Sequence, residues 1–231
     1  MEKLEEKINA ACHRSGRRRE EIELMGVTKF QNPETVEEAI GAGLRLFGES
    51  RVQEALKKYS QDSVPHFWDL HKRGEVKLHF IGNLQRNKAA KAVDFFDCIQ
   101  SVDRDSLIDE LGALTSARES PLMILLEYHT GEESKAGFRS RDELFRAVEK
   151  VISFSGLLPA GLMTMAPYNA GKAVVRSAFR ELSLARDELL KRFRTFPWDC
   201  LSMGMTDDFE IAIEEGSTLI RIGSAIFGEQ E

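Results

Sequence analysis

The fold is decided by a short stretch near the start of the chain, Ile22-Glu23-Leu24-Met25-Gly26-Val27-Thr28-Lys29. It is an apolar, strand-like run that ends in a lysine. The helix starter Asn32-Pro33 follows, and a helical pattern over residues 34–42 is closed by Gly43. The stretch therefore predicts one strand, one loop and one helix.

The same order recurs along the rest of the chain. Further strands are expected at residues 44–47, 77–81, 98–101, 122–127, 156–163, 198–202 and 218–222. Helices are expected at residues 49–59, 87–95, 104–114, 142–152, 172–193 and 207–215. One more helix, with Leu4, Ile8, Ala11 and Cys12 on one face, precedes the first strand.

Eight strands alternating with helices predict an α/β fold, a single (β/α)8 barrel of the TIM type. We expect one domain over residues 1–231, with the extra N-terminal helix in 1–20 and the barrel in 21–231. A doubly wound open sheet is the alternative.

Composition excludes several classes of protein. The chain has 231 residues, 32 basic and 38 acidic side chains and a net charge of −6, which argues against a nucleic-acid binder. A hydrophobic content of 42% can fill one sizeable core, and the disordered, collagen and disulfide-scaffold classes do not fit. The apolar stretch 151–167 is interrupted by Pro and Gly residues, so no membrane span is expected.

The three cysteines, Cys12, Cys98 and Cys200, lie far apart and form no C-x-x-C motif. This pattern suits buried thiols in a reducing compartment better than disulfides or a zinc site. The acidic start of the chain does not resemble a secretory signal, so a cytoplasmic location is expected.

The connection from Ser60 to Glu75 is longer than most loops in such units, and we expect a short extra element there, at the rim of the barrel. It holds His66 and His71, and His79 follows in the next strand. These histidines have no recognised ligand spacing, so no metal site is predicted.

In barrel enzymes the site lies at the carboxyl ends of the strands. Lys29 directly follows the first strand and would present a nucleophilic amine in the mouth of the barrel. A salt-bridged rim lysine is the alternative. Loops 202–206 and 221–225 follow the seventh and eighth strands, where barrels commonly bind phosphate. A helix cap at Thr206 and a simple turn at Gly223 are the alternatives.

A phosphate pocket together with a strand-end lysine suggests a phosphorylated aldehyde held as a Schiff base, and pyridoxal 5′-phosphate (PLP) is the obvious candidate. Seven ordered motifs support this hypothesis: Val27-Thr28-Lys29, the stretches 47–54 and 79–88, Ser134-Lys135-Ala136-Gly137-Phe138, Gly161-Leu162-Met163, and the stretches 201–206 and 216–228. Together they resemble the pyridoxal phosphate homeostasis protein family over nearly the whole chain, from about Glu21 to Gly228.

The resemblance implies a barrel similar to the N-terminal domain of alanine racemase, with PLP bound covalently to Lys29. By the same resemblance, Ser202, Gly223 and Ser224 would hold the phosphate, and Arg221 would face the pyridine nitrogen. His79 and Met203 would help to wall the cofactor. Ser50 stands at a cofactor-side position where the family usually has Asn, which bears on one hydrogen bond to the cofactor.

The resemblance also implies a role in vitamin B6 and amino-acid homeostasis. A permanently charged, donor-only arginine at the ring nitrogen favours the unprotonated ring and weakens it as an electron sink. Alanine racemase also uses a tyrosine from a second domain, for which this chain is too short. We therefore expect a PLP carrier with no catalytic residues of its own.

Such a carrier is expected to be a monomer that transfers the cofactor to apo-PLP enzymes. A PLP-dependent racemase or lyase acting on a small amino acid is the alternative. A third hypothesis is a regulatory module that docks a protein partner through the segment 60–75.

Overall fold

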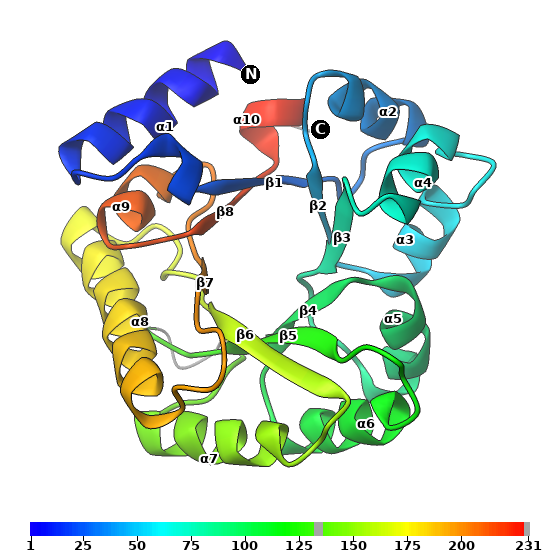
Figure 1. Cartoon of the computed structure of the whole chain (residues 1–231). Helices are drawn as coiled ribbons and strands as arrows, with labels where there is room; N and C mark the ends of the chain where they lie inside the picture. Colours follow the sequence, from blue (N-terminus) through cyan, green and yellow to red (C-terminus); the bar gives the residue numbers. More distant parts are fainter. Residues whose placement is uncertain (132–135, 229–231) are drawn as a thin grey trace.

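The computed structural model contains a closed barrel of parallel strands in the order β1-β2-β3-β4-β5-β6-β7-β8, surrounded by helices (Figure 1). It describes residues 1–131 and 136–228. The strands are β1 (Glu23–Val27), β2 (Leu46–Glu49), β3 (Lys77–Phe80), β4 (Cys98–Val102), β5 (Leu122–Glu127), β6 (Leu157–Met163), β7 (Cys200–Ser202) and β8 (Leu219–Ile222). Pairing of β1 with both β2 and β8 closes the barrel, with Met25 beside Leu46 on one side and Arg221 on the other. The predicted (β/α)8 barrel is confirmed, and the open-sheet alternative is wrong.

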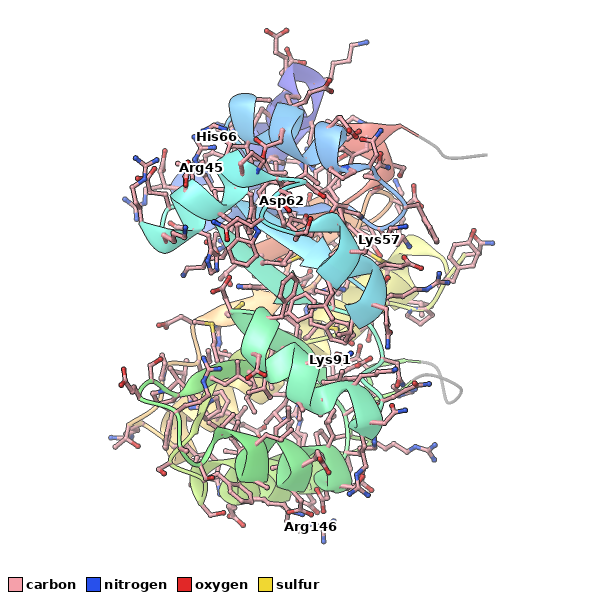
Figure 2. All side chains as sticks on the ribbon, turned by 90° about the vertical axis from the view of Figure 1, so that its right-hand side faces the viewer. Arg45, Lys57, Asp62, His66, Lys91 and Arg146 are labelled. Carbon is pink, nitrogen blue, oxygen red and sulfur yellow. The ribbon has the colours of Figure 1, made fainter. Side chains whose placement is uncertain are left out.

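Helices form the outer layer. They are α1 (Glu2–Arg14), α2 (Pro33–Gly41), α3 (Val52–Lys58), α4 (Pro65–Lys72), α5 (Ala89–Phe95), α6 (Asp105–Thr115), α7 (Arg141–Ile152), α8 (Lys172–Arg192), α9 (Phe209–Glu214) and α10 (Ser224–Phe227), with 3-10 turns η1 (Arg19–Glu21) and η2 (Arg86–Lys88). The expected helix starter is present: the Asn32 side chain accepts a hydrogen bond from the Thr35 N–H at 2.8 Å. Charged side chains such as Arg45, Lys57, Lys91 and Arg146 are exposed on the outer surface (Figure 2). Among the described residues, no helix has both the length and the apolar content to cross a membrane.

The extra N-terminal helix α1 covers the barrel beside the last βα unit. Its buried face of Leu4, Ile8, Ala11 and Cys12 packs in one cluster with Ile22, which precedes β1, and with residues of α9 and β8. Farther along the chain, the Arg17 guanidinium donates to the carbonyl of Ser217 at 2.5 Å. The first and last parts of the chain are therefore packed together.

The long connection after α3 forms helix α4 in the outer layer. Its Phe67 is fully buried and makes edge-on ring contacts with Phe47 and Tyr59. The indole N–H of Trp68 donates to the Tyr59 carbonyl at 2.8 Å. The segment 60–75 thus has a packing role over β2.

The boundary of β2 differs from the prediction. The strand covers Leu46–Glu49 rather than 44–47, and Glu49, which was predicted to begin a helix, is the last strand residue. The ladder explains the shift, because the Glu49 carbonyl accepts from the Ile81 N–H at 2.9 Å. The Glu49 side chain contacts Thr28 and, on α3, Lys58, so it lies between the barrel and the helices.

The inward face of the barrel changes from apolar to polar along several strands. Cys98, Leu125, Cys200 and Leu219 contribute to the apolar interior clusters. Two residues further on, and so on the same face of each strand, stand Gln100, Glu127, Ser202 and Arg221. The polar ends lie on the carboxyl side of the barrel, which is where the sequence predicts a site.

Candidate functional site

The eight predicted site residues lie on one continuous arc of the barrel, formed by β7, β8, β1, β2 and β3. Lys29 follows β1 and is exposed, and Ser50 follows β2. His79 lies in β3, and Met203 follows β7. The other four are Ser202 at the end of β7, Arg221 in β8, and Gly223 and Ser224 directly after β8. Among them, the structure places the side chains of Ser202 and Arg221 in direct contact.

Arg221 is almost fully buried, with 4% of its surface exposed. One guanidinium nitrogen donates to the Ser202 carbonyl at 2.8 Å and to its hydroxyl at 2.6 Å, and the other terminal nitrogen donates to the Thr164 carbonyl at 2.8 Å. Burial lowers the pKa of Arg221, while the charges of Glu127 and Asp208 oppose that effect. The cation is therefore solvated mainly by neutral oxygens.

Gln100 is a site residue that sequence reasoning missed. Its amide oxygen accepts from the Ser202 hydroxyl at 2.6 Å, and its amide nitrogen lies 2.9 Å from Nδ1 of His79. Gln100 is fully buried, and Nε2 of His79 is buried without a partner among the described residues. The sequence offered one indication of this role, because Gln100 is a polar residue that directly follows the apolar Cys98 and Ile99 within a predicted strand.

The start of α10 offers backbone donors. The N–H groups of Gly223, Ser224 and Ala225 donate to no carbonyl of the described residues, as is usual in a first helical turn. The Ser224 hydroxyl lies 3.1 Å from that of Thr206, so the loops after β7 and β8 meet here. In contrast, Ser202 is fully buried, and its hydroxyl is bonded to Gln100 and Arg221.

A buried ion pair lies behind the strand end that carries Lys29. The Lys58 ammonium is 2.8 Å from Glu49 Oε1 and also donates to the Thr28 carbonyl, the peptide group just before Lys29. The Thr28 hydroxyl donates to Glu49 at 2.7 Å and lies 2.8 Å from the Tyr59 hydroxyl. Burial, followed by the charge of Glu49, raises the pKa of Tyr59 well above its usual value. This cluster fixes the backbone at Lys29.

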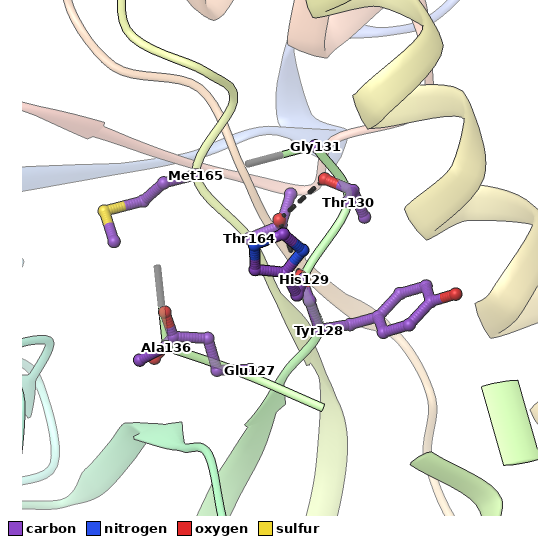
Figure 3. Close-up of a pocket in the computed structure, with 8 residues that line it drawn as sticks. All are labelled: Glu127, Tyr128, His129, Thr130, Gly131, Ala136, Thr164 and Met165. Carbon is purple, nitrogen blue, oxygen red and sulfur yellow. Dashed lines mark hydrogen bonds between the residues drawn. The ribbon is translucent and has the colours of Figure 1, made fainter. Parts of the chain in front are cut away.

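A small pocket opens at the ends of β5 and β6 (Figure 3). It is lined by Glu127, Tyr128, His129, Thr130, Gly131, Ala136, Thr164 and Met165. Glu127 is 5% exposed, and burial together with the charge of Asp103 raises its pKa to about 7, against the opposing charge of Arg221. The pocket therefore contains a carboxyl group that can gain or lose a proton near neutral pH. Ser134 and Lys135 of the adjacent sequence motif lie outside the described residues.

The family model "Alanine racemase, N-terminal domain" matches residues 2–231. This parallel barrel, with Lys29 after β1 and the buried Arg221 in β8, therefore belongs to the class built on that domain. A pyridoxal phosphate homeostasis protein of Aquifex aeolicus is 36% identical over 231 residues, which are 100% of this chain and 97% of the relative. The chain belongs to the pyridoxal phosphate homeostasis protein family.

Two solved structures place the chain further. PipY of Synechococcus elongatus, solved with PLP bound, matches this chain with a TM-score of 0.79 and 31% sequence identity. The match covers 96% of this chain and 99% of the PipY chain. Alanine racemase of Clostridium difficile has a TM-score of 0.70 at 9% identity, covering 97% of this chain and 55% of that enzyme. The second likeness is one of fold alone.

Proposed function

We propose that this protein binds PLP at the mouth of the barrel, holds it covalently through Lys29, and serves vitamin B6 and amino-acid homeostasis. The observation that carries the proposal is the placement of the buried Arg221 in β8, beside β1, whose end bears Lys29. The names of the homeostasis relatives and the PLP bound in PipY support the same ligand. When bound, PLP supplies a reactive aldehyde and an electron-withdrawing ring.

The residues present fit this group. The Lys29 amine is exposed at the strand end and can form the Schiff base with the aldehyde. Backbone N–H groups at Gly223, Ser224 and Ala225 can receive a phosphate, because unpaired amide donors at a helix start favour an anion. Arg221 is a donor that can face an unprotonated pyridine nitrogen. Ser50, His79 and Met203 are proposed as walls of the same site.

We assign the protein a carrier role without robust catalysis. Two of its three tyrosines use their hydroxyl groups away from the mouth, since Tyr59 bonds Thr28 and Tyr128 donates to Glu181 at 3.0 Å. Burial and the charge of Glu181 raise the pKa of Tyr128 to about 12, so it is a poor acid or base at neutral pH. The third, Tyr168, is 79% exposed. In this role the protein is a cytoplasmic monomer that hands PLP to apo-enzymes.

The test combines absorption spectra with borohydride reduction and mass spectrometry. Wild type incubated with PLP should turn yellow and, after reduction, carry the pyridoxyl group on Lys29. Lys29→Ala should show neither, while Lys57→Ala, which removes an exposed lysine of the outer surface, should behave as wild type. A wild type that takes up no PLP, or an adduct on other lysines only, would overturn the proposal.

A PLP-dependent racemase or lyase is the second candidate, favoured by the Glu127 carboxyl group near the mouth. Exchange of the Cα proton of alanine and serine in heavy water, followed by NMR together with chiral analysis, decides between the two. Catalytic exchange that is lost in Glu127→Gln would establish the enzyme. Exchange no faster than with free PLP would leave the carrier role.

A further inference from the structure

A buried chain of hydrogen bonds crosses the barrel interior from β8 to β3. It runs from Arg221 to Ser202 at 2.6 Å, from Ser202 to Gln100 at 2.6 Å, and from Gln100 to Nδ1 of His79 at 2.9 Å. All four residues are at most 5% exposed. Because the chain is shielded from water, each hydrogen atom that lies between two of its members must find its acceptor in the neighbouring member.

The direction of the chain follows from the chemistry of Arg221. A guanidinium only donates, so the Ser202 oxygen accepts from it. The single Ser202 hydrogen must then point to Gln100, which turns the Gln100 carbonyl toward Ser202 and its amide N–H toward His79. Nδ1 of His79 must accept, so the proton of the neutral imidazole lies on Nε2.

The reverse direction is disfavoured. If the Gln100 amide were flipped, the Ser202 oxygen would face donors from both Arg221 and Gln100, and its own hydrogen would have no acceptor in the chain. Nε2 of His79 has no partner among the described residues in either direction, so the two directions differ in the Ser202 hydrogen. A buried hydroxyl hydrogen without an acceptor shifts such an equilibrium by on the order of tenfold or more. The charge in β8 therefore sets the tautomer of a histidine in β3.

The geometry points to Gln100 and His79 as positioning residues, which act through the Ser202 hydroxyl to hold the Arg221 guanidinium in one orientation. They do so without a hydrogen-bonded carboxylate. No carboxylate of the described residues hydrogen-bonds Arg221, although the charges of Glu127 and Asp208 act on it without a direct contact, so the guanidinium can still face a ligand in the mouth. This inference deepens the proposed function, because it rests on Arg221 as the group that meets the ring nitrogen of PLP.

Other groups around His79 agree with a neutral ring. Burial lowers the pKa of His79 to about 4, although the charge of Asp97 raises it, and that of Lys77 lowers it further. His71 provides an internal contrast: its Nε2 lies 2.9 Å from an Asp97 carboxylate oxygen, and this hydrogen bond raises its pKa. A carboxylate hydrogen bond thus raises the pKa of His71, whereas burial without such a partner lowers the pKa of His79.

The experiment is a two-bond proton–nitrogen NMR spectrum of the cofactor-free protein with 15N-labelled histidine. The chain has five histidines, and the His79 signals are assigned by their loss in His79→Asn. At pH 7 His79 should show a protonated Nε2 and an unprotonated Nδ1. In Gln100→Glu, a carboxylate oxygen replaces the amide donor, so Nδ1 should become protonated and the His79 titration should move toward that of His71.

Ser202→Ala is the second variant. This substitution removes the group that orients Gln100. The His79 tautomer with its proton on Nδ1 should therefore rise from under about a tenth of the population to about the same population as the tautomer with its proton on Nε2. Ser217→Ala is the matched control, because Ser217 is also fully buried between β7 and β8 but bonds only backbone carbonyls. It should leave the His79 signals unchanged.

A wild-type His79 with its proton on Nδ1, or a Gln100→Glu variant with unchanged His79 signals, would overturn the inference. A Ser202→Ala variant that retains the wild-type tautomer would do the same. PLP affinity is measured separately on the same variants. Predicted tautomers with no PLP binding by wild type would leave the hydrogen-bond chain intact and reject the proposed function instead.

Discussion

Lys58 Nζ and Glu49 Oε1 lie 2.8 Å apart in a buried ion pair directly behind the strand end that carries Lys29. The side chains are 8% and 0% exposed, and Oε2 of Glu49 has no hydrogen-bond partner among the described residues. Within residues 1–131 and 136–228, Lys58 is thus the one cation that forms an ion pair with this carboxylate. The pair also holds the peptide group before Lys29, so it links stability to the site.

Removing one member of this pair should be costly. Lys58→Met leaves a buried carboxylate unpaired, and the free energy of unfolding in urea should fall by about 3–5 kcal/mol. Arg73→Met is the control, because Arg73 pairs with Glu75 at 60% and 48% exposure and should cost less than about 1 kcal/mol. Equal losses in the two variants would contradict the role given to Lys58.

Glu127 should make stability depend on pH. Its folded pKa of about 7 lies above the usual 4.5, so the contribution is fully present below pH 4.5 and is lost as pH rises through 7. The contribution of Glu127 to the free energy of unfolding should fall by about 3 kcal/mol between pH 4.5 and pH 7, at roughly 1.4 kcal/mol for each pH unit. Glu127→Gln should flatten the profile and be more stable than wild type at pH 8. Parallel profiles for the two proteins would refute this.

Gly161 in β6 should tolerate no side chain. A Cβ there would lie 1.8 Å from the carbonyl oxygen of Cys200 in β7, a backbone atom that cannot move aside without opening the ladder. Gly161→Ala should lower the free energy of unfolding, measured in urea, by about 3 kcal/mol. Gly41→Ala, at a helical position with no heavy atom within 4 Å, should instead stabilise by about 0.5–1 kcal/mol. A neutral Gly161→Ala would mean that the two strands can separate locally.

Ser224 should contribute to phosphate binding only. Ser224→Ala should weaken PLP by about tenfold, the value of one charge-assisted hydrogen bond, measured by equilibrium titration. Pyridoxal, which lacks the phosphate, should bind wild type and variant equally. A similar loss for both ligands would place the phosphate elsewhere.

The fold could be predicted from sequence because each strand and helix carries its own local pattern. The stripe of Val175, Phe179 and Leu182 on α8 is one example, because residues at this spacing share one face of a helix, and all three are buried. Glu49 was placed wrongly, since an acidic residue before an amphipathic stretch resembles a helix start, whereas its partners Thr28 and Lys58 are visible only in three dimensions. Gln100 was missed for the same reason, because its partner Ser202 is 102 residues away.

The pairing of β1 with β8 has a consequence for how the protein is made. The first strand finds one of its two neighbours only in the last strand of the chain. Contacts between residues so far apart in the sequence form late and slowly, because the entropy of closing a long loop is lost before the contacts can stabilise the chain. On the ribosome, the edge of β1 stays open until β8 has emerged, so a chain stalled before Leu219 has every other strand and an unpaired edge.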